Sequence, residues 1–110
     1  MINIDDLSES NRRAIVRAME YWVEHWDWES PTLFGLSFEE LAAFTKTWPQ
    51  SIVEKSSIAE LVIVGAFREL LFGASSASDA NVSKTLGIDY NEAKDLVIEL
   101  HRRFNQEKQS

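Results

Sequence analysis

The sequence contains no cysteine, and it has only two histidines, two prolines and four glycines among 110 residues. Without cysteine there is no disulfide framework, no thiolate nucleophile and no zinc site built on cysteine. The longest apolar run, Leu61 to Phe67, is far too short to cross a bilayer. The first residues lack the basic and apolar blocks of a signal peptide. We therefore expect a soluble, cytoplasmic protein without a membrane partner.

The scarcity of histidine and glycine also limits the chemistry available to the chain. Acid–base or nucleophilic catalysis needs convergent side chains, yet only His25 and His101 are present, with no glycine-rich phosphate loop and no nucleophile motif. His25, Asp27 and Glu29 include three potential metal ligands, but a helix would spread residues at this spacing around its axis. We expect no enzymatic activity, no cofactor and no metal site.

Apolar residues are plentiful and follow a helical period. Hydrophobic residues make up 45% of the chain, which is enough for a substantial core in a chain of single-domain length. They recur at three- and four-residue spacing, and no window alternates convincingly in the manner of a strand. The sequence predicts an all-α fold, a single compact bundle of four to five helices, with one domain over residues 1–110.

Apolar spacing places the first helix, and a capping signal places the second. The first is predicted over residues 8 to about 26 or 28, stopping before Pro31. The second begins at Ser37, because Ser37 and Glu40 form the Ser-x-x-Glu pattern of a capping box. It is expected to end near Trp48, since the proline that follows disfavours helical geometry in the residue before it.

The second half of the chain predicts a buried central helix and two further helices. Ser57 and Glu60 repeat the capping pattern, and the nearly uncharged helix that follows is expected to run to Gly73. Small residues over 74–78 predict a loop. The last helix is expected to fray into a polar tail at residues 105–110.

A short helix ended by Gly87, followed by a helix capped by Asp89 and Glu92, has the shape of a helix-turn-helix unit. In such units the second helix offers its first turns to DNA bases and phosphates. Here those turns carry Asp89, Glu92 and Asp95 against Lys94. This charge predicts no nucleic-acid partner, and a helix-turn-helix-like regulatory or adaptor domain is the alternative interpretation.

The acidity of the protein is regional. The net charge is −7, and residues 20 to 60 hold eight Asp or Glu residues against two lysines, together with all four tryptophans. An acidic surface edged with aromatic rings repels nucleic acid and attracts a basic protein. The pattern favours a protein-binding function.

An acidic stripe near the end of the first predicted helix carries this hypothesis. Glu20, Glu24 and Asp27 follow at four- and three-residue spacing on one side of that helix, and Glu29 lies just beyond. The C-terminal end of a helix disfavours acids, so stability alone does not explain them, although a solvated charged face needs no function. Trp28, set between two acids, is either an exposed anchor or a lid folded over the core. A dense acidic stripe would repel itself across a symmetric interface, so no homo-oligomer is expected.

Several segments together resemble a known family. The stretch from Leu33 to Leu41 leading to Trp48-Pro49, the stretch from Ala66 to Gly73, and the Leu86-Gly87-Ile88 corner are similar to small all-helical immunity proteins of bacterial toxin systems, such as contact-dependent inhibition. The resemblance covers roughly residues 20–104. It implies a cytoplasmic protein that binds the toxic domain of a cognate effector, often a nuclease, and blocks its active site or a neighbouring surface.

The predicted partner is therefore a cognate toxin with a basic domain. Carboxylates of this protein would occupy the positions where that domain binds phosphate, and Trp28 would anchor the contact. The predicted partner-binding residues come from charge and exposure arguments and not from the resemblance. They are Glu20, Glu24, Asp27, Trp28, Glu29, Glu39 and Glu40.

Overall fold

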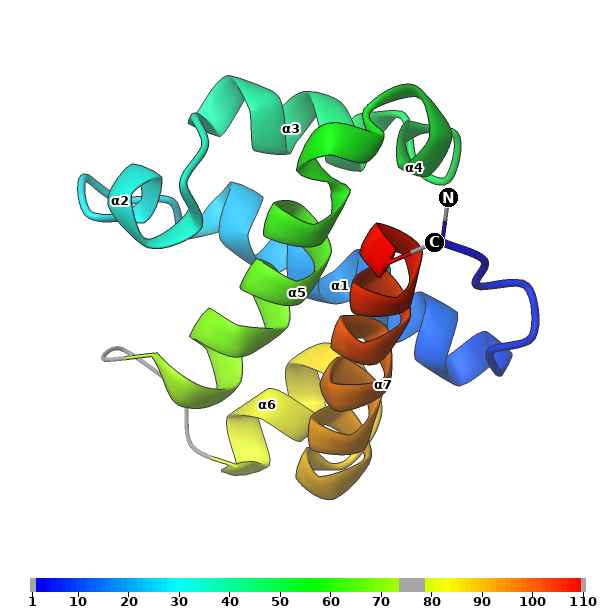
Figure 1. Ribbon diagram of the computed structural model, residues 1–110. Helices are drawn as coiled ribbons and strands as arrows, with labels where there is room; N and C mark the ends of the chain where they lie inside the picture. Colours follow the sequence, from blue (N-terminus) through cyan, green and yellow to red (C-terminus); the bar gives the residue numbers. More distant parts are fainter. Residues whose placement is uncertain (1, 74–78, 110) are drawn as a thin grey trace.

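A computed structural model of the protein describes residues 2–73 and 79–109. Its helices are α1 (Glu9–Glu24), α2 (Ser30–Phe34), α3 (Phe38–Lys46), α4 (Ser51–Glu54), α5 (Ser56–Phe72), α6 (Asp79–Leu86) and α7 (Tyr90–Gln109). Figure 1 shows α5 running through the middle of the molecule with the other helices around it. The all-α prediction is confirmed over the described residues, but seven helices replace the predicted four to five.

The count differs because two short helices occupy segments that were interpreted as breaks. Pro31 was expected to stop a helix, whereas it stands in the first turn of α2. Proline suits that position because the missing N–H would have no partner within the helix and its fixed φ is already helical. Gly35, with φ of 75°, ends α2 in the left-handed conformation. α4 likewise follows directly after Pro49.

The predicted capping box of α3 is confirmed, and α1 begins beside the expected residue, with Ser8 as its cap. The Ser8 hydroxyl accepts a hydrogen bond from the Asn11 N–H at 3.1 Å, and both halves of the Ser37–Glu40 capping box are formed. α1 ends at Glu24, however, which is earlier than the prediction of Trp26 or Trp28. α3 ends at Lys46, close to the expected position.

The capping box predicted at the start of α5 is wrong. α5 begins at Ser56 without a side-chain cap, and Lys55 is both the last flanking residue of α4 and the first of α5. Ser57 therefore already lies inside the helix, where its side chain cannot cap the start. The rest of the prediction for this helix is confirmed, since α5 contacts every other helix and ends at Gly73.

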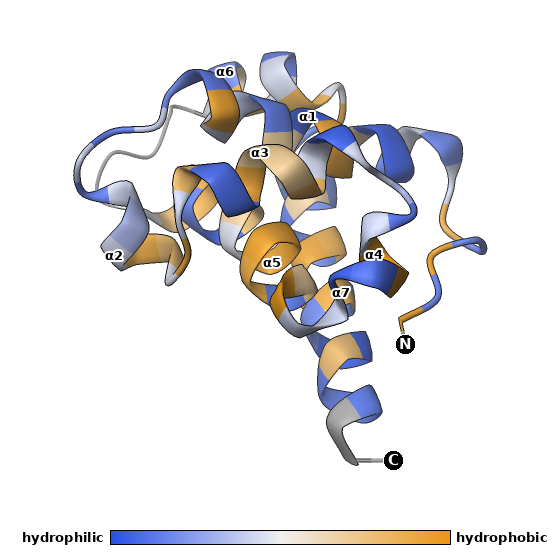
Figure 2. Cartoon of the chain, turned by 90° about the horizontal axis from the view of Figure 1, so that it is seen from above, coloured by the Kyte–Doolittle hydropathy of each residue, from blue (hydrophilic) through white to orange (hydrophobic). Residues whose placement is uncertain are grey.

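The core forms around α5, and Figure 2 shows this apolar helix enclosed by more polar ones. Trp22 is buried, and its indole N–H donates a hydrogen bond to the Ala66 carbonyl at 2.9 Å. Phe34 of α2 lies over Gly65, where an added Cβ would come within 3.1 Å of the Phe34 ring. Burial of these rings fixes α1 and α2 against α5.

The corner between α6 and α7 also follows the prediction. Gly87 has φ of 78°, and the Glu92 N–H donates to Asp89 Oδ1 at 2.8 Å. α7 continues through Gln109, so the predicted tail at residues 105–110 is helical over 105–109. Phe104 is buried at this end and holds the last turns against the core. The predicted loop at residues 74–78 lies outside the described residues.

Side chains of α7 also hold the N-terminal segment, residues 2–8. The Arg103 guanidinium forms two hydrogen bonds of 2.8 Å with the Asp6 carboxylate and one with the Asn3 carbonyl. The pKa of Glu99 is lowered to about 2 by hydrogen bonds from Arg102 and then Arg103. None of the described helices has the length and apolarity that a membrane crossing requires.

Candidate protein-binding site

The turn between α1 and α2 is built on Asp27. Its carboxylate accepts hydrogen bonds from the Glu29 N–H at 2.9 Å and from the N–H and hydroxyl of Ser30 at 3.1 Å. In return, the Asp27 N–H donates to the Ser30 hydroxyl at 3.1 Å. The prediction that Asp27 continues the stripe of α1 is therefore wrong, because the helix ends at Glu24 and the Asp27 carboxylate accepts N–H and hydroxyl groups of the turn that follows.

Trp28 projects from this turn. It is 85% exposed, so the alternative in which it folds back as a lid on the core is wrong. Trp26 takes the inward place, with its ring centroid 5.4 Å from that of Phe34 and 5.9 Å from that of Phe38. Because the backbone on both sides of Trp28 is hydrogen-bonded within the turn, the exposed ring is held on a defined support.

Further apolar side chains are exposed on the elements that follow Trp28. Leu33 on α2 is 41% exposed and Phe38 at the start of α3 is 36% exposed. Glu29 and Glu39, one beside Trp28 and one beside Phe38, are exposed as well. We call these five residues the α2 corner. Figure 1 shows α2 and the turn before it at one end of the molecule, and apolar groups rimmed by charge are typical of protein-binding surfaces.

Glu20 and Glu24 lie beside α6 and not in the α2 corner. Together with Arg17 they line a groove of about 480 Å³ between α1 and α6, and Lys84 lines it from the other side. The stripe on α1 is therefore edged by two basic residues. Neither glutamate forms an ion pair with a basic side chain in the described part of the chain.

Glu40 is exposed, but its carboxylate accepts the Ser37 N–H at 2.9 Å in the capping box. Its predicted role in binding competes with this role at the start of α3. Glu39, one residue earlier, makes no such bond. The predicted site thus divides into three groups. Trp28, Glu29 and Glu39 lie in the α2 corner, and Glu20 and Glu24 line the α1–α6 groove. The carboxylates of Asp27 and Glu40 accept hydrogen bonds from nearby backbone N–H groups.

The arrangement of acidic side chains also bears on metal binding and on DNA binding. Across residues 2–73 and 79–109, no three acidic or histidine side chains are arranged to hold a metal ion. The first turns of α7 expose Glu92 and Asp95, while the Lys94 ammonium lies 5.7 Å from the centre of the Tyr90 ring. The corner has the shape of a helix-turn-helix unit, and the charge that opposes DNA remains exposed.

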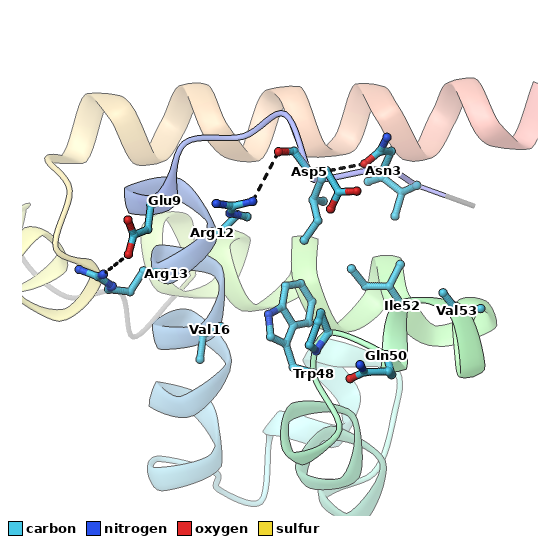
Figure 3. Close-up of a pocket in the computed structure, with 13 residues that line it drawn as sticks. Asn3, Asp5, Glu9, Arg12, Arg13, Val16, Trp48, Gln50, Ile52 and Val53 are labelled. Carbon is cyan, nitrogen blue, oxygen red and sulfur yellow. Dashed lines mark hydrogen bonds and ion pairs between the residues drawn. The ribbon is translucent and has the colours of Figure 1, made fainter.

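A second concave site was missed by the sequence analysis. The N-terminal segment, α1 and residues 48–53 enclose a pocket of about 830 Å³, shown in Figure 3 and here called the N-terminal pocket. Its signal in the sequence is the pair Ile2 and Ile4, which alternate before the first cap and are both buried. Residues so close to the start of the chain form a pocket only because tertiary packing brings Trp48 opposite them.

The comparisons with known proteins give no match. No protein-family model matches the chain, and neither the curated proteins nor the solved structures include a significant match to it. The proposal of a function therefore depends on the geometry and charge of these sites.

Proposed function

We propose that the protein is a toxin immunity protein, which binds a basic toxic domain of nuclease type and occludes it. The observation that carries the proposal is the exposure of Trp28 on a hydrogen-bonded turn within the acidic half of the chain. Tryptophan is rarely left in water in a monomeric protein, because burying its ring removes a large apolar area from solvent. A partner that covers Trp28 would recover this free energy.

The turn also reduces the cost of binding. A side chain held on an ordered backbone loses less conformational entropy when a partner covers it than one on a mobile loop. The Asp27–Ser30 hydrogen bonds fix the backbone on both sides of Trp28. Leu33 on α2 and Phe38 at the start of α3 add exposed apolar side chains on the elements that follow. This combination of a rigid aromatic anchor and exposed apolar neighbours is typical of binding hot spots.

Charge supplies the choice of partner. Glu29 and Glu39 in the α2 corner, and Glu20 and Glu24 along α1, are exposed carboxylates. A nuclease binds phosphate through arginine and lysine side chains, and carboxylates pair with the same groups. The acidic field also accelerates the encounter with a basic domain and repels nucleic acid. Inhibition is then occlusion of the toxin surface.

The test pairs the protein with the product of the neighbouring open reading frame, which the proposal expects to carry the toxic domain. Co-expression should restore growth, and the purified protein should bind the domain and inhibit its activity. Trp28→Ala should raise the Kd at least about thirtyfold, since a hot-spot residue contributes about 2 kcal/mol or more. Ile98→Ala is the matched control, because Ile98 is 64% exposed on α7, outside the α2 corner. Equal effects of the two changes would contradict the proposal.

The alternative function, a helix-turn-helix-like regulatory domain, is favoured by the shape of the α6–α7 corner. Its electrostatics are unfavourable, since Glu92 and Asp95 would meet phosphate. At physiological salt the purified protein should not retard random or genomic DNA fragments in a gel. Sequence-dependent retardation would reverse the ranking of the two functions.

A further inference from the structure

We propose that the N-terminal pocket is a binding site for a small organic carboxylate with an aromatic or branched aliphatic body. The pocket shares no residue with the α2 corner, so this inference is independent of toxin binding. Its volume of about 830 Å³ lies in the range of small-molecule sites, which combine apolar walls with a few polar groups.

The apolar part of the pocket would hold the body of the ligand. Its apolar lining includes Ile2 and Ile4 of the N-terminal segment, Val16 of α1 and Ile52 of α4. Figure 3 shows the Trp48 indole between Val16 and Ile52. Trp48 is half-buried, and its ring packs on Phe44 with the centroids 6.2 Å apart. A flat or branched apolar group placed against this indole would displace water from apolar surface.

The charged residues of the pocket determine which polar head group a ligand can carry. Four charged residues line the pocket, and two of them neutralise each other, because Arg13 Nη2 lies 2.8 Å from the Glu9 carboxylate. Arg12 is half-buried and donates one bond, at 3.4 Å, to the Asp5 backbone carbonyl. Within the described ranges Arg12 has no carboxylate partner. Arg12 therefore offers the pocket N–H donors on a cation whose charge no carboxylate pairs, unlike that of Arg13.

These charges favour a carboxylate over other heads. A guanidinium binds a carboxylate through two parallel hydrogen bonds, and a partly desolvated cation gains more from an anion than an exposed one. Asp5 is exposed, so water already solvates its charge. A phosphate would bring a second negative charge toward Asp5 and Glu9, and an amine would meet Arg12 and Arg13. A single negative charge on an apolar body fits the pocket best.

The test uses a matched pair of probes, 4-phenylbutyrate and 4-phenylbutan-1-ol, which share their apolar body. Each is titrated into the ¹⁵N-labelled protein, with the Trp48 indole and the Val53 amide as reporters in NMR spectra. The carboxylate should shift both signals saturably and bind about tenfold or more tightly than the alcohol, because it adds a charge-assisted hydrogen bond. Equal binding of both probes, or shifts that spare Trp48, would overturn the proposal.

Variants identify the group responsible. Arg12→Gln should abolish the preference for the carboxylate, whereas Arg17→Gln, on the same helix but outside the pocket, should preserve it. Val53→Glu places an anion on an exposed wall residue, and it should weaken the carboxylate more than the alcohol even if Arg12→Gln destabilises the fold. A preference that survives Arg12→Gln, or one that Val53→Glu does not reduce, contradicts the assignment.

Two further outcomes separate this site from the α2 corner. Trp28→Ala should leave probe binding unchanged, whether or not it affects the toxin. If the pocket signals respond to the toxic domain but to neither probe, the pocket is part of the protein interface and the small-molecule assignment is wrong.

Discussion

Two corners of the molecule share one local design. In the first, α2 ends at Gly35, and in the second, α6 ends at Gly87; both glycines have positive φ. Each glycine is followed by a buried aliphatic residue, Leu36 or Ile88, and then by the residue that caps the next helix. The sequence pattern of glycine, aliphatic residue and cap therefore ends one helix and starts the next at both places.

The two corners differ in what they expose. The α2 corner exposes Trp28, Leu33 and Phe38, whereas the first turns of α7 expose Glu92 and Asp95. The caps and glycines stabilise the turns in both places, so they carry no information about binding. The side chains around each turn are what differ, and our proposal of a protein partner rests on those of the α2 corner.

The largest expected effect is the loss of stability when the buried aliphatic residue of either corner is shortened. Leu36→Ala and Ile88→Ala should each lower the free energy of unfolding by about 2–4 kcal/mol, because both remove a buried side chain and leave a cavity. Chemical denaturation monitored by circular dichroism measures this. If one change cost less than about 1 kcal/mol, the two corners would not be equivalent.

A smaller change in the free energy of unfolding distinguishes Asp27, in the turn between α1 and α2, from Glu24 at the end of α1. Asp27→Ala should cost about 1–2 kcal/mol, since it removes the acceptor of three hydrogen bonds. Glu24→Lys should stabilise by a few tenths of a kcal/mol, roughly 0.3, because a cation suits the end of α1. Thermal denaturation of both variants checks the contrast. Equal effects would mean that Asp27 is ordinary surface.

Glycine substitutions should separate the corners by about 1 kcal/mol or less. Gly35→Ala and Gly87→Ala each force a Cβ into the left-handed region, at a cost of about 1 kcal/mol. A Cβ at Gly87 would also come within 2.8 Å of Arg17 Nη1, whereas nothing lies within 4 Å at Gly35. Gly87→Ala should therefore cost slightly more. The extra cost should disappear in an Arg17→Ala background, and its persistence there would exclude this contact as the cause.

The smallest expected effect is a pH-dependent change in stability at the far end of α7, where Glu99 forms ion pairs with Arg102 and Arg103. The pKa of Glu99 in the folded protein is lowered from 4.5 to about 2 by Arg102 and Arg103. The stability from this carboxylate is thus fully present above pH 4.5 and is lost as the pH falls toward 2. Glu99→Gln should lower the Tm at pH 7, and the difference should vanish near pH 2. A difference that is independent of pH would contradict this.

Sequence patterns of short range predicted much of the fold. The start near Ser8, the caps at Ser37 and Asp89 and the stop at Gly87 were correct, because each depends on backbone groups within four residues. The cap at Ser57 was not, since the preceding helix α4 leaves no gap for a separate start. Pattern matching cannot detect that a neighbouring turn already supplies the helical geometry.

The candidate site was predicted less completely than the fold. The sequence identified Trp28 as an aromatic residue between acids, but its exposure depends on which of Trp26 and Trp28 packs against Phe34. Asp27 was assigned to the wrong group because the end of α1 moved by a few residues. Beyond the end of α1 the Asp27 carboxylate accepts hydrogen bonds from the turn that follows, whereas within the helix it would be surface charge.

By itself, the sequence determined the helical class, the regional acidity and the chemistry of the turns, because these follow from composition and from interactions between near neighbours. Only the tertiary structure decided that Trp28 faces water, that Glu20 and Glu24 share a groove with Lys84, and that Ile2 meets Trp48 in a pocket. Those outcomes depend on packing between segments far apart in the chain, and α5, which contacts every other helix, sets that packing.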